Sequence, residues 1–219
     1  MSPPIVLFDL DGTVSDSAAG ILAALRHAFA ANGVAPVDAP TERALLGPPF
    51  HESLPPIVGA ERVPAVIASY REHYASTMYE TAPFDGVPAV LEALRTAGRR
   101  LAVATSKPEP YAVPIVEHLG LAEAFETIGG DELDGSFGTK ALVIARVLQR
   151  LGNPAPQDVV MVGDRLHDVL GAREHGIECI AVRWGYATPG ELDDARPARI
   201  VDSPGQLAAE LGVSVGAVR

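Results

Sequence analysis

Short apolar runs alternate with helical patterns along most of this chain, and this alternation limits the possible folds more than any other feature. Continuous apolar strands separated by helices are typical of a parallel sheet covered on both faces. The sequence therefore predicts an α/β fold with three layers. The expected strands are residues 5–10, 101–105, 158–163, 178–182 and, more weakly, 199–201, and the expected helices between them are 87–97, 110–119, 139–151, 167–175 and 204–211.

The interval between Leu10 and Leu101 breaks this rhythm, because it contains no convincing strand and far exceeds the dozen or so residues that a crossover needs. Helical patterns at 16–31, 41–46 and 64–79 fill it, with prolines and glycines at the joints. We therefore expect a helical subdomain at residues 15–82, inserted into a core that is formed by residues 1–14 and 83–219.

Charge and cysteine content restrict the partners and the compartment. The chain has 17 Lys and Arg against 28 Asp and Glu, a net charge of −11, which disfavours a nucleic-acid polymer or an anionic membrane surface as partner. A single cysteine, Cys179, cannot form a disulfide within the chain. A reducing, cytoplasmic environment is the expectation, and the oligomeric state stays open.

Polar side chains follow three of the expected strands. Ligands of open parallel sheets bind beyond the carboxyl ends of the strands, so we expect these side chains to meet. Four carboxylates in one crevice would stay partly protonated or bind a cation, and oxygen ligands alone suit a hard ion such as Mg²⁺. The residues at these positions are Asp9 and Asp11, then Thr105 and Ser106, then Asp164 and Asp168.

The chain contains only two lysines, Lys107 and Lys140. Lys140 stands at the start of an expected helix, where its ammonium could meet a phosphate oxygen. Taken alone, it could equally be a solvated lysine in the first turn of a helix.

Together these residues resemble the four signatures of the haloacid dehalogenase superfamily. Asp9-Leu10-Asp11-Gly12-Thr13 is similar to the first, Thr105 to the second, Lys140 to the third and Gly163-Asp164-x-x-x-Asp168 to the fourth, in the right order. The resemblance implies a Rossmann-like core with a helical cap of the first type. The stretch 163–169 and the later Trp184-Gly185-Tyr186 look most like the phosphoglycolate phosphatase and 5′-nucleotidase-like branch.

The resemblance also implies a mechanism for a small phosphorylated metabolite. Asp9 would attack the phosphoryl group and form an aspartyl-phosphate. Asp11 would protonate the leaving alcohol and then deprotonate the water that hydrolyses this intermediate. Thr105, Ser106 and Lys140 would hold the phosphoryl oxygens. Mg²⁺ would be held by Asp9, by the main chain of Asp11, by Asp164 and by Asp168.

Single residues argue against some of the other activities that the resemblance to this superfamily allows. Asp11 argues against a dehalogenase, and a cap without lysine argues against a phosphonate hydrolase. A sugar-phosphate mutase stays open. So does a protein tyrosine kinase of this fold, which resembles the chain at 103–107 and 47–49. In the cap loop, Gly47 and His51 are candidate substrate contacts, and His51 could equally be an exposed loop residue.

Overall fold

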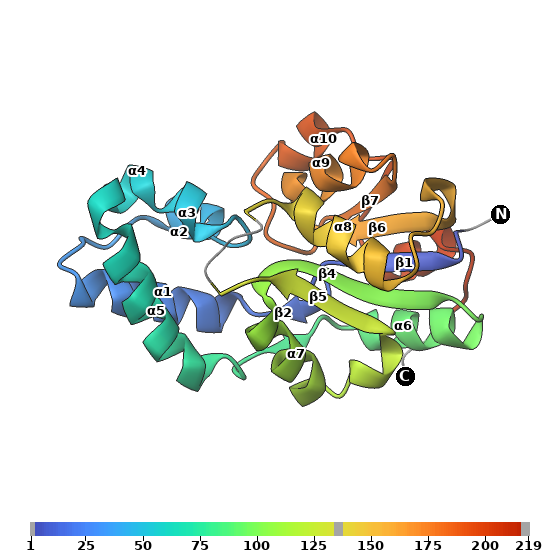
Figure 1. Cartoon of the computed structure of the whole chain (residues 1–219), viewed down its shortest axis with the longest axis horizontal. Coiled ribbons are helices and arrows are strands. Elements are labelled where there is room, and N and C mark those ends of the chain that lie inside the picture. Colours follow the sequence, from blue (N-terminus) through green and yellow to red (C-terminus); the bar gives the residue numbers. More distant parts are fainter. Residues whose placement is uncertain (1–2, 134–137, 216–219) are drawn as a thin grey trace.

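A computed structural model describes residues 3–133 and 138–215. Strands and helices alternate through most of this part of the chain (Figure 1). The strands are Ile5–Phe8 (β1), Ser15–Asp16 (β2), Ala82–Pro83 (β3), Arg100–Pro108 (β4), Thr127–Asp131 (β5), Val159–Gly163 (β6), Glu178–Val182 (β7) and Arg199–Val201 (β8). The α-helices are Ala18–Ala31 (α1), Ala39–Ala44 (α2), Phe50–Ser53 (α3), Pro55–Val58 (α4), Val63–Thr77 (α5), Val87–Thr96 (α6), Glu109–His118 (α7), Lys140–Arg150 (α8), Leu166–Glu174 (α9), Glu191–Ala195 (α10) and Pro204–Glu210 (α11), and short 3₁₀ turns lie at Ala60–Arg62, Ala122–Ala124 and Pro156–Asp158.

Six strands form one sheet in the order β5-β4-β1-β6-β7-β8, and each neighbouring pair is parallel. The predicted α/β class is therefore confirmed. The edge strand β5 is absent from the sequence prediction. Its residues include Gly129 and Gly130, which weaken the strand pattern, and a side chain at Gly129 would strike Val147 of α8.

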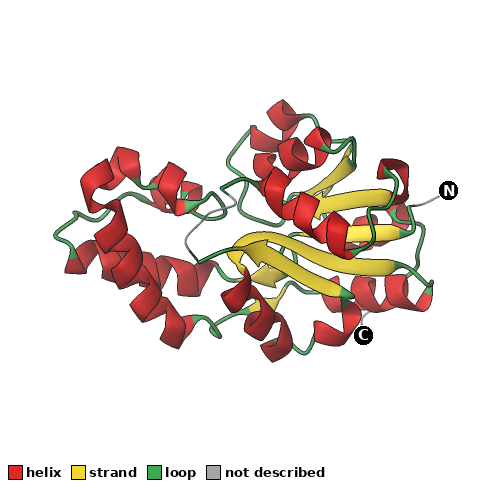
Figure 2. Ribbon diagram, viewed as in Figure 1, coloured by secondary structure: helices red, strands yellow, loops and turns green. Residues whose placement is uncertain are grey.

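The two faces of the sheet carry separate apolar cores, and helices cover both of them (Figure 2). Side chains alternate along β1, so Val6 and Phe8 join one core while Ile5 and Leu7 join the other. Helices α6, α7 and α11 contribute to the first core, and α8 and α9 contribute to the second. This is the three-layer arrangement that a sheet of doubly buried strands requires.

Helices α1 to α5 stand beside the sheet rather than on it, as Figure 1 shows. The long helices α1 and α5 pack against each other, with Leu25 and Val66 buried. The predicted helix at 41–46 begins earlier, at Ala39, because Asp38 caps it by accepting from the amide of Thr41. Helices α3 and α4 fall in a proline-rich stretch where no helix is predicted. The interval between Leu10 and Leu101, predicted to contain no strand, holds two short ones, since β2 and β3 form an antiparallel pair.

The sheet reverses its direction of winding between β1 and β6. From β1 the later strands proceed through β4 to β5 on one side, whereas from β6 they proceed through β7 to β8 on the other. Loops that leave two such strands diverge and open a crevice at their carboxyl ends. Asp9 follows β1 and Asp164 follows β6, so both stand at this crevice.

Among residues 3–133 and 138–215, no helix combines the length and the apolar character needed to cross a bilayer.

Candidate active site

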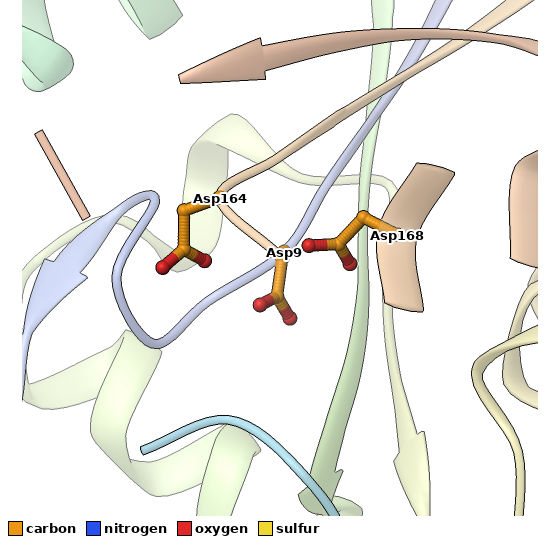
Figure 3. A group of neighbouring side chains, drawn as sticks. All are labelled: Asp9, Asp164 and Asp168. Atoms are coloured by element: carbon orange, nitrogen blue, oxygen red, sulfur yellow. The ribbon is translucent and has the colours of Figure 1, made fainter. Parts of the chain in front are cut away.

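Three aspartates converge at the crevice (Figure 3). The amide of Asp9 donates to the carbonyl of Val162 at 2.9 Å, which ties the end of β1 to β6. Asp164 directly follows β6, and Asp168 lies in the first turn of α9. One carboxylate oxygen from each of the three lies within 4.8 Å of the others, and all three residues are buried.

Two glycines of the motifs make this approach possible. Gly12 has a φ of +84°, and a Cβ there would lie 2.3 Å from Oδ2 of Asp164. A Cβ at Gly163 would lie 2.2 Å from Cγ of Asp168. The motif glycines thus leave the space in which the carboxylates sit.

Lys140 supplies a positive charge to this cluster. Its Nζ lies 2.7 Å from Oδ1 of Asp9 and 2.7 Å from Oδ1 of Asp168, and its side chain is buried. Thr139 caps α8 by accepting from the amide of Leu142, so helix α8 begins where Lys140 can reach inward. Burial lowers the pKa of Lys140, but Asp168 and Asp9 outweigh it and hold the pKa above its usual value. The structure therefore places this lysine in the crevice and not in solvent.

The pKa values of two of the aspartates are raised. Burial, then the charges of Asp9 and Asp168, raise the pKa of Asp164 well above its usual value, although the amide of Tyr186 donates to its Oδ2 at 2.6 Å. Burial also raises the pKa of Asp168, to about 6, against the opposing effect of Lys140. Negative charge in the crevice thus exceeds what the protein neutralises.

These residues fit a hard divalent cation. Three carboxylates face one lysine in a buried space, so the site carries an excess of two negative charges when all three are ionised. The donor set is oxygen alone, which is the set that Mg²⁺ and Ca²⁺ prefer. A cation among Asp9, Asp164 and Asp168 would favour the ionised carboxylates, against the burial and the mutual repulsion that raise the pKa values of Asp164 and Asp168.

Asp11 lies outside this group of three. Its Oδ1 accepts from the hydroxyl of Ser17 at 2.6 Å, and its Oδ2 lies 3.0 Å from Nζ of Lys107. The carboxylate therefore turns toward the helical insert. The expected contact of Asp11 with a metal, through its main-chain carbonyl, stays a prediction.

Lys107 has no assigned role in the sequence analysis, although it is one of two lysines in the chain. Its side chain is buried, donates to the hydroxyl of Tyr74 on α5 at 2.7 Å, and lies 4.6 Å from the centre of that ring. Burial lowers the pKa of Lys107, but Asp11 and Tyr74 outweigh it and raise the pKa above its usual value. The scarcity of lysine was the signal that could have identified this residue.

Thr105 and Ser106 occupy the end of β4. The hydroxyl of Thr105 is buried and accepts from the amide of Lys107 at 3.2 Å, which shapes the turn after the strand core. Ser106 is half-buried and faces two cavities, one of them shared with Asp11 and the other with Lys140. Their expected contacts with phosphoryl oxygens stay predictions.

Gly47 and His51 line the cavity that also contains Asp11 and Ser106. Gly47 has a φ of +103°, and a Cβ there would lie 3.0 Å from Nη1 of Arg165 in the loop after β6. The side chain of His51 is 48% exposed and lies 3.7 Å from Glu52. Both therefore stand at the candidate site, and contact with a substrate stays a prediction.

Comparison with known proteins supports the resemblance seen in the motifs. Residues 6–182 match a family model described as haloacid dehalogenase-like hydrolase. The crystal structure of a predicted phosphatase from Clostridium acetobutylicum superimposes with a TM-score of 0.91 at 34% identity, covering 96% of this chain and 99% of that one.

Two curated relatives have different activities in their names. A 5′-nucleotidase of Pseudomonas aeruginosa is 38% identical over 197 residues, which is 89% of each chain. The tyrosine-protein kinase PtkA of Mycobacterium tuberculosis is 45% identical over 193 residues, 88% of this chain. This chain spans 66% of the length of PtkA, just under two thirds. The expected likeness to the phosphoglycolate phosphatase and 5′-nucleotidase-like branch is confirmed.

Proposed function

The chain belongs to the haloacid dehalogenase-like hydrolases, and from that premise we propose that it is a Mg²⁺-dependent phosphatase acting on a small phosphomonoester. The ester would be of the phosphoglycolate or nucleoside 5′-monophosphate type, because proteins named for those activities are among its relatives. A cytoplasmic location belongs to the same proposal.

Residues 1–14 and 83–219 would form the catalytic core, and residues 15–82 a cap that covers it. The contacts of the cap with the core support this division. Tyr74 reaches Lys107, and Arg43 donates to the carbonyl of Gly185 at 2.7 Å.

Asp9 would act as the nucleophile. Its carboxylate attacks phosphorus, the bond from phosphorus to the leaving alcohol breaks, and an aspartyl-phosphate forms. Asp11 gives a proton to the leaving oxygen and then takes one from the water that hydrolyses the aspartyl-phosphate, so that free phosphate leaves and Asp9 is restored. Ser17 and Lys107 hold the Asp11 carboxylate toward the cap side, where the leaving group would lie.

Charge neutralisation would be shared by lysine and metal. Phosphoryl transfer depends mainly on positioning and on stabilising negative charge. Lys140 holds the Asp9 carboxylate and, with Thr105 and Ser106, would contact the phosphoryl oxygens. Bound Mg²⁺, held by Asp9, Asp164, Asp168 and the main chain of Asp11, would supply electrostatic stabilisation of the transferring group.

The observation that carries the proposal is the meeting of Asp9, Asp164 and Asp168 within 4.8 Å, with Lys140 bridging two of them. The proposed nucleophile therefore lies in the same buried crevice as carboxylate oxygens whose negative charge one lysine does not fully neutralise. Phosphomonoester hydrolysis through an aspartyl-phosphate would use this combination.

The direct test is phosphate release from p-nitrophenyl phosphate with and without Mg²⁺. We expect steady turnover that EDTA abolishes, and a loss of about a thousandfold or more in Asp9→Asn, because a catalytic nucleophile is removed. Asp194→Asn, an exposed acid, is the matched control and should keep full activity. An active Asp9→Asn protein would refute the assignment of the nucleophile.

Similarity to PtkA favours a second candidate, transfer of phosphate to a protein tyrosine. Incubation with γ-labelled ATP separates the two. Label on a tyrosine of an acceptor protein supports the kinase. No label on the acceptor, together with release of phosphate from p-nitrophenyl phosphate by the same preparation, supports the phosphatase. The sugar-phosphate mutase stays a prediction.

A further inference from the structure

A cavity lies between the cap and the core, directly beside Asp11. About 870 Å³ of empty space, part of it open to solvent, lies among its lining residues. Asp11 and its ion-pair partner Lys107 line the cavity, whereas Asp9, Asp164 and Asp168 are not among its lining residues. The leaving group of the proposed substrate would therefore occupy it.

Aromatic rings are concentrated in this cavity. The chain has five tyrosines, and three of them, Tyr70, Tyr74 and Tyr111, line it together with Phe50. Helices α3 and α5 of the cap contribute three of these rings, and α7 of the core contributes Tyr111 (Figure 1). A chain with 5% aromatic residues thus places four of them at one site.

The four rings contact one another in a continuous row. Tyr70 and Tyr74 stack, with centres 5.2 Å apart and planes 13° from parallel. Phe50 meets Tyr70 edge to face at 4.7 Å, and Tyr111 meets Tyr74 edge to face at 5.8 Å. The central pair is buried, whereas the two outer rings are half-buried and so present surface to the cavity.

This row begins close to the reacting atoms. The hydroxyl of Tyr74 accepts from Nζ of Lys107, and that nitrogen lies 3.0 Å from Oδ2 of Asp11. A ring a few bonds from the ester oxygen would therefore reach this row of rings. Ile67 and Leu45 add apolar surface to the same lining.

The charges around the cavity fit a neutral leaving group better than a carboxylate. Of the described residues that line it, the cations are Lys107, already paired with Asp11, and Arg71, which donates to the carbonyl of Leu133. The same lining includes Asp131 and Glu132, and Glu132 is paired with Arg146 at 2.6 Å. Burial raises the pKa of Tyr70 and of Tyr74, so both rings stay neutral.

From this geometry we infer that the preferred substrate is a phosphomonoester whose leaving alcohol carries a planar ring, bound against Phe50 and Tyr111, the two rings of the row that present surface to the cavity. The inference rests on the proposed phosphatase function and specifies its substrate class. Offset stacking and edge-to-face contacts favour a flat ring over a saturated one of similar size.

The test compares substrates that differ only in the ring. Benzyl phosphate is paired with cyclohexylmethyl phosphate, and adenosine 5′-monophosphate with ribose 5-phosphate. We expect kcat/KM to be roughly tenfold higher for the planar-ring member of at least one pair, mainly through a lower KM. Equal values within both pairs would overturn the inference. The comparison uses the wild-type protein, so it does not depend on any variant folding.

Variants then locate the ring contact. Phe50→Leu and Tyr111→Leu keep apolar volume but remove a ring, and each should reduce the ratio of kcat/KM between the two members of a pair. Tyr79→Leu, a ring outside the cavity that is 42% exposed, should leave the ratio unchanged. A ratio that resists both cavity variants would contradict the assigned position of the ring.

A substrate that carries a carboxylate instead of a ring tests the alternative that the cavity selects an anion. If 2-phosphoglycolate exceeds both ring substrates and Arg71→Met removes that advantage, the cavity selects an anion and the inference is wrong. Equal release of phosphate from every ester would refute the ring preference alone, while no release from any ester would refute the phosphatase itself.

Discussion

At the scale of single residues, the site depends on glycines as much as on acids. Gly163 stands at the end of β6, directly before Asp164, and faces Asp168 so closely that any side chain would displace the carboxylate. The motif therefore needs glycine at position 163 for steric reasons, in addition to the aspartates that could bind a metal.

We expect Gly163→Ala to weaken the affinity for Mg²⁺ although it removes no carboxylate. The added Cβ would lie 2.2 Å from Cγ of Asp168, so that side chain must move. Displacing a supporting contact of a metal site typically costs about 10- to 100-fold in metal affinity. A titration of phosphatase activity against Mg²⁺ would measure the shift in half-saturation.

Gly205→Ala is the matched control for that titration. A Cβ at Gly205 would meet only Ser203, at 4.0 Å. The control should keep the Mg²⁺ dependence of the wild type, and an unchanged half-saturation in Gly163→Ala would contradict the steric argument.

At the level of elements, helix α1 of the helical insert is joined through a tyrosine to the chain that follows β7. Ser17 precedes α1 but uses its hydroxyl to bind Asp11, so it does not cap the helix. The hydroxyl of Tyr186 replaces it and accepts from the amides of Ser17 and Ala18 at 2.8 and 3.0 Å. It also donates to Asp16 at 3.0 Å.

Tyr186→Phe should therefore lower the free energy of unfolding by about 1–3 kcal/mol, because it leaves two helix amides without their acceptor. Urea unfolding followed by circular dichroism would measure the change. Tyr79→Phe, at an exposed tyrosine, should have no measurable effect. Equal midpoints for the two variants would argue against the capping role.

Helices α9 and α10 are held together by Glu191. Its carboxylate accepts from Nε of Arg165 at 2.7 Å, from the amide of Leu166 at 3.0 Å, and from the amide and hydroxyl of Thr188 at 2.9 Å each. Burial raises the pKa of Glu191, but Arg165 and the two amides outweigh it and lower the pKa to about 2.

This shift predicts a pH-dependent contribution to stability. The folded pKa is about 2 against an ordinary value of 4.5, so the contribution is complete above pH 4.5 and is lost as the pH falls toward 2. We expect Glu191→Gln to destabilise the protein by about 1–3 kcal/mol at pH 7. The difference from wild type should shrink below about pH 4.5 in urea unfolding curves. A constant difference from pH 7 to pH 3 would contradict the shift.

At the scale of the whole molecule, the proposed metal should act as a structural ligand as well as a catalytic one. The crevice joins the ends of β1 and β6 with the start of α9 and α8, and its three carboxylates repel each other without a cation. Binding to the folded state alone stabilises it by mass action.

Mg²⁺ at about 100 times its dissociation constant should stabilise the protein by about 2.7 kcal/mol, which raises Tm by roughly 5–10 °C for a chain of this size. EDTA should reverse the shift. Asp164→Asn should lose it while unfolding no earlier than the metal-free wild type, since one repelling charge is gone. Differential scanning calorimetry measures both, and a magnesium shift that persists in Asp164→Asn would contradict the ligand assignment.

Local sequence patterns were enough to predict the parallel sheet, the helical insert and the motif residues at the strand ends. These follow from local patterns, because strand and helix periodicity and the glycines beside the acids are all written in neighbouring residues. Asp9, Asp164 and Lys140 could be singled out for that reason.

The pairing of strands and the contacts between residues distant in the chain became known only from the three-dimensional structure. The edge strand β5 exists because β4 pairs with it, although its glycines carry little strand signal of their own. Lys107, Tyr74 and Tyr186 gain their roles from partners that are 33 or more residues away in the chain. Such contacts depend on how the helical insert packs beside the sheet. Patterns among neighbouring residues carry no information about partners so far apart in the chain.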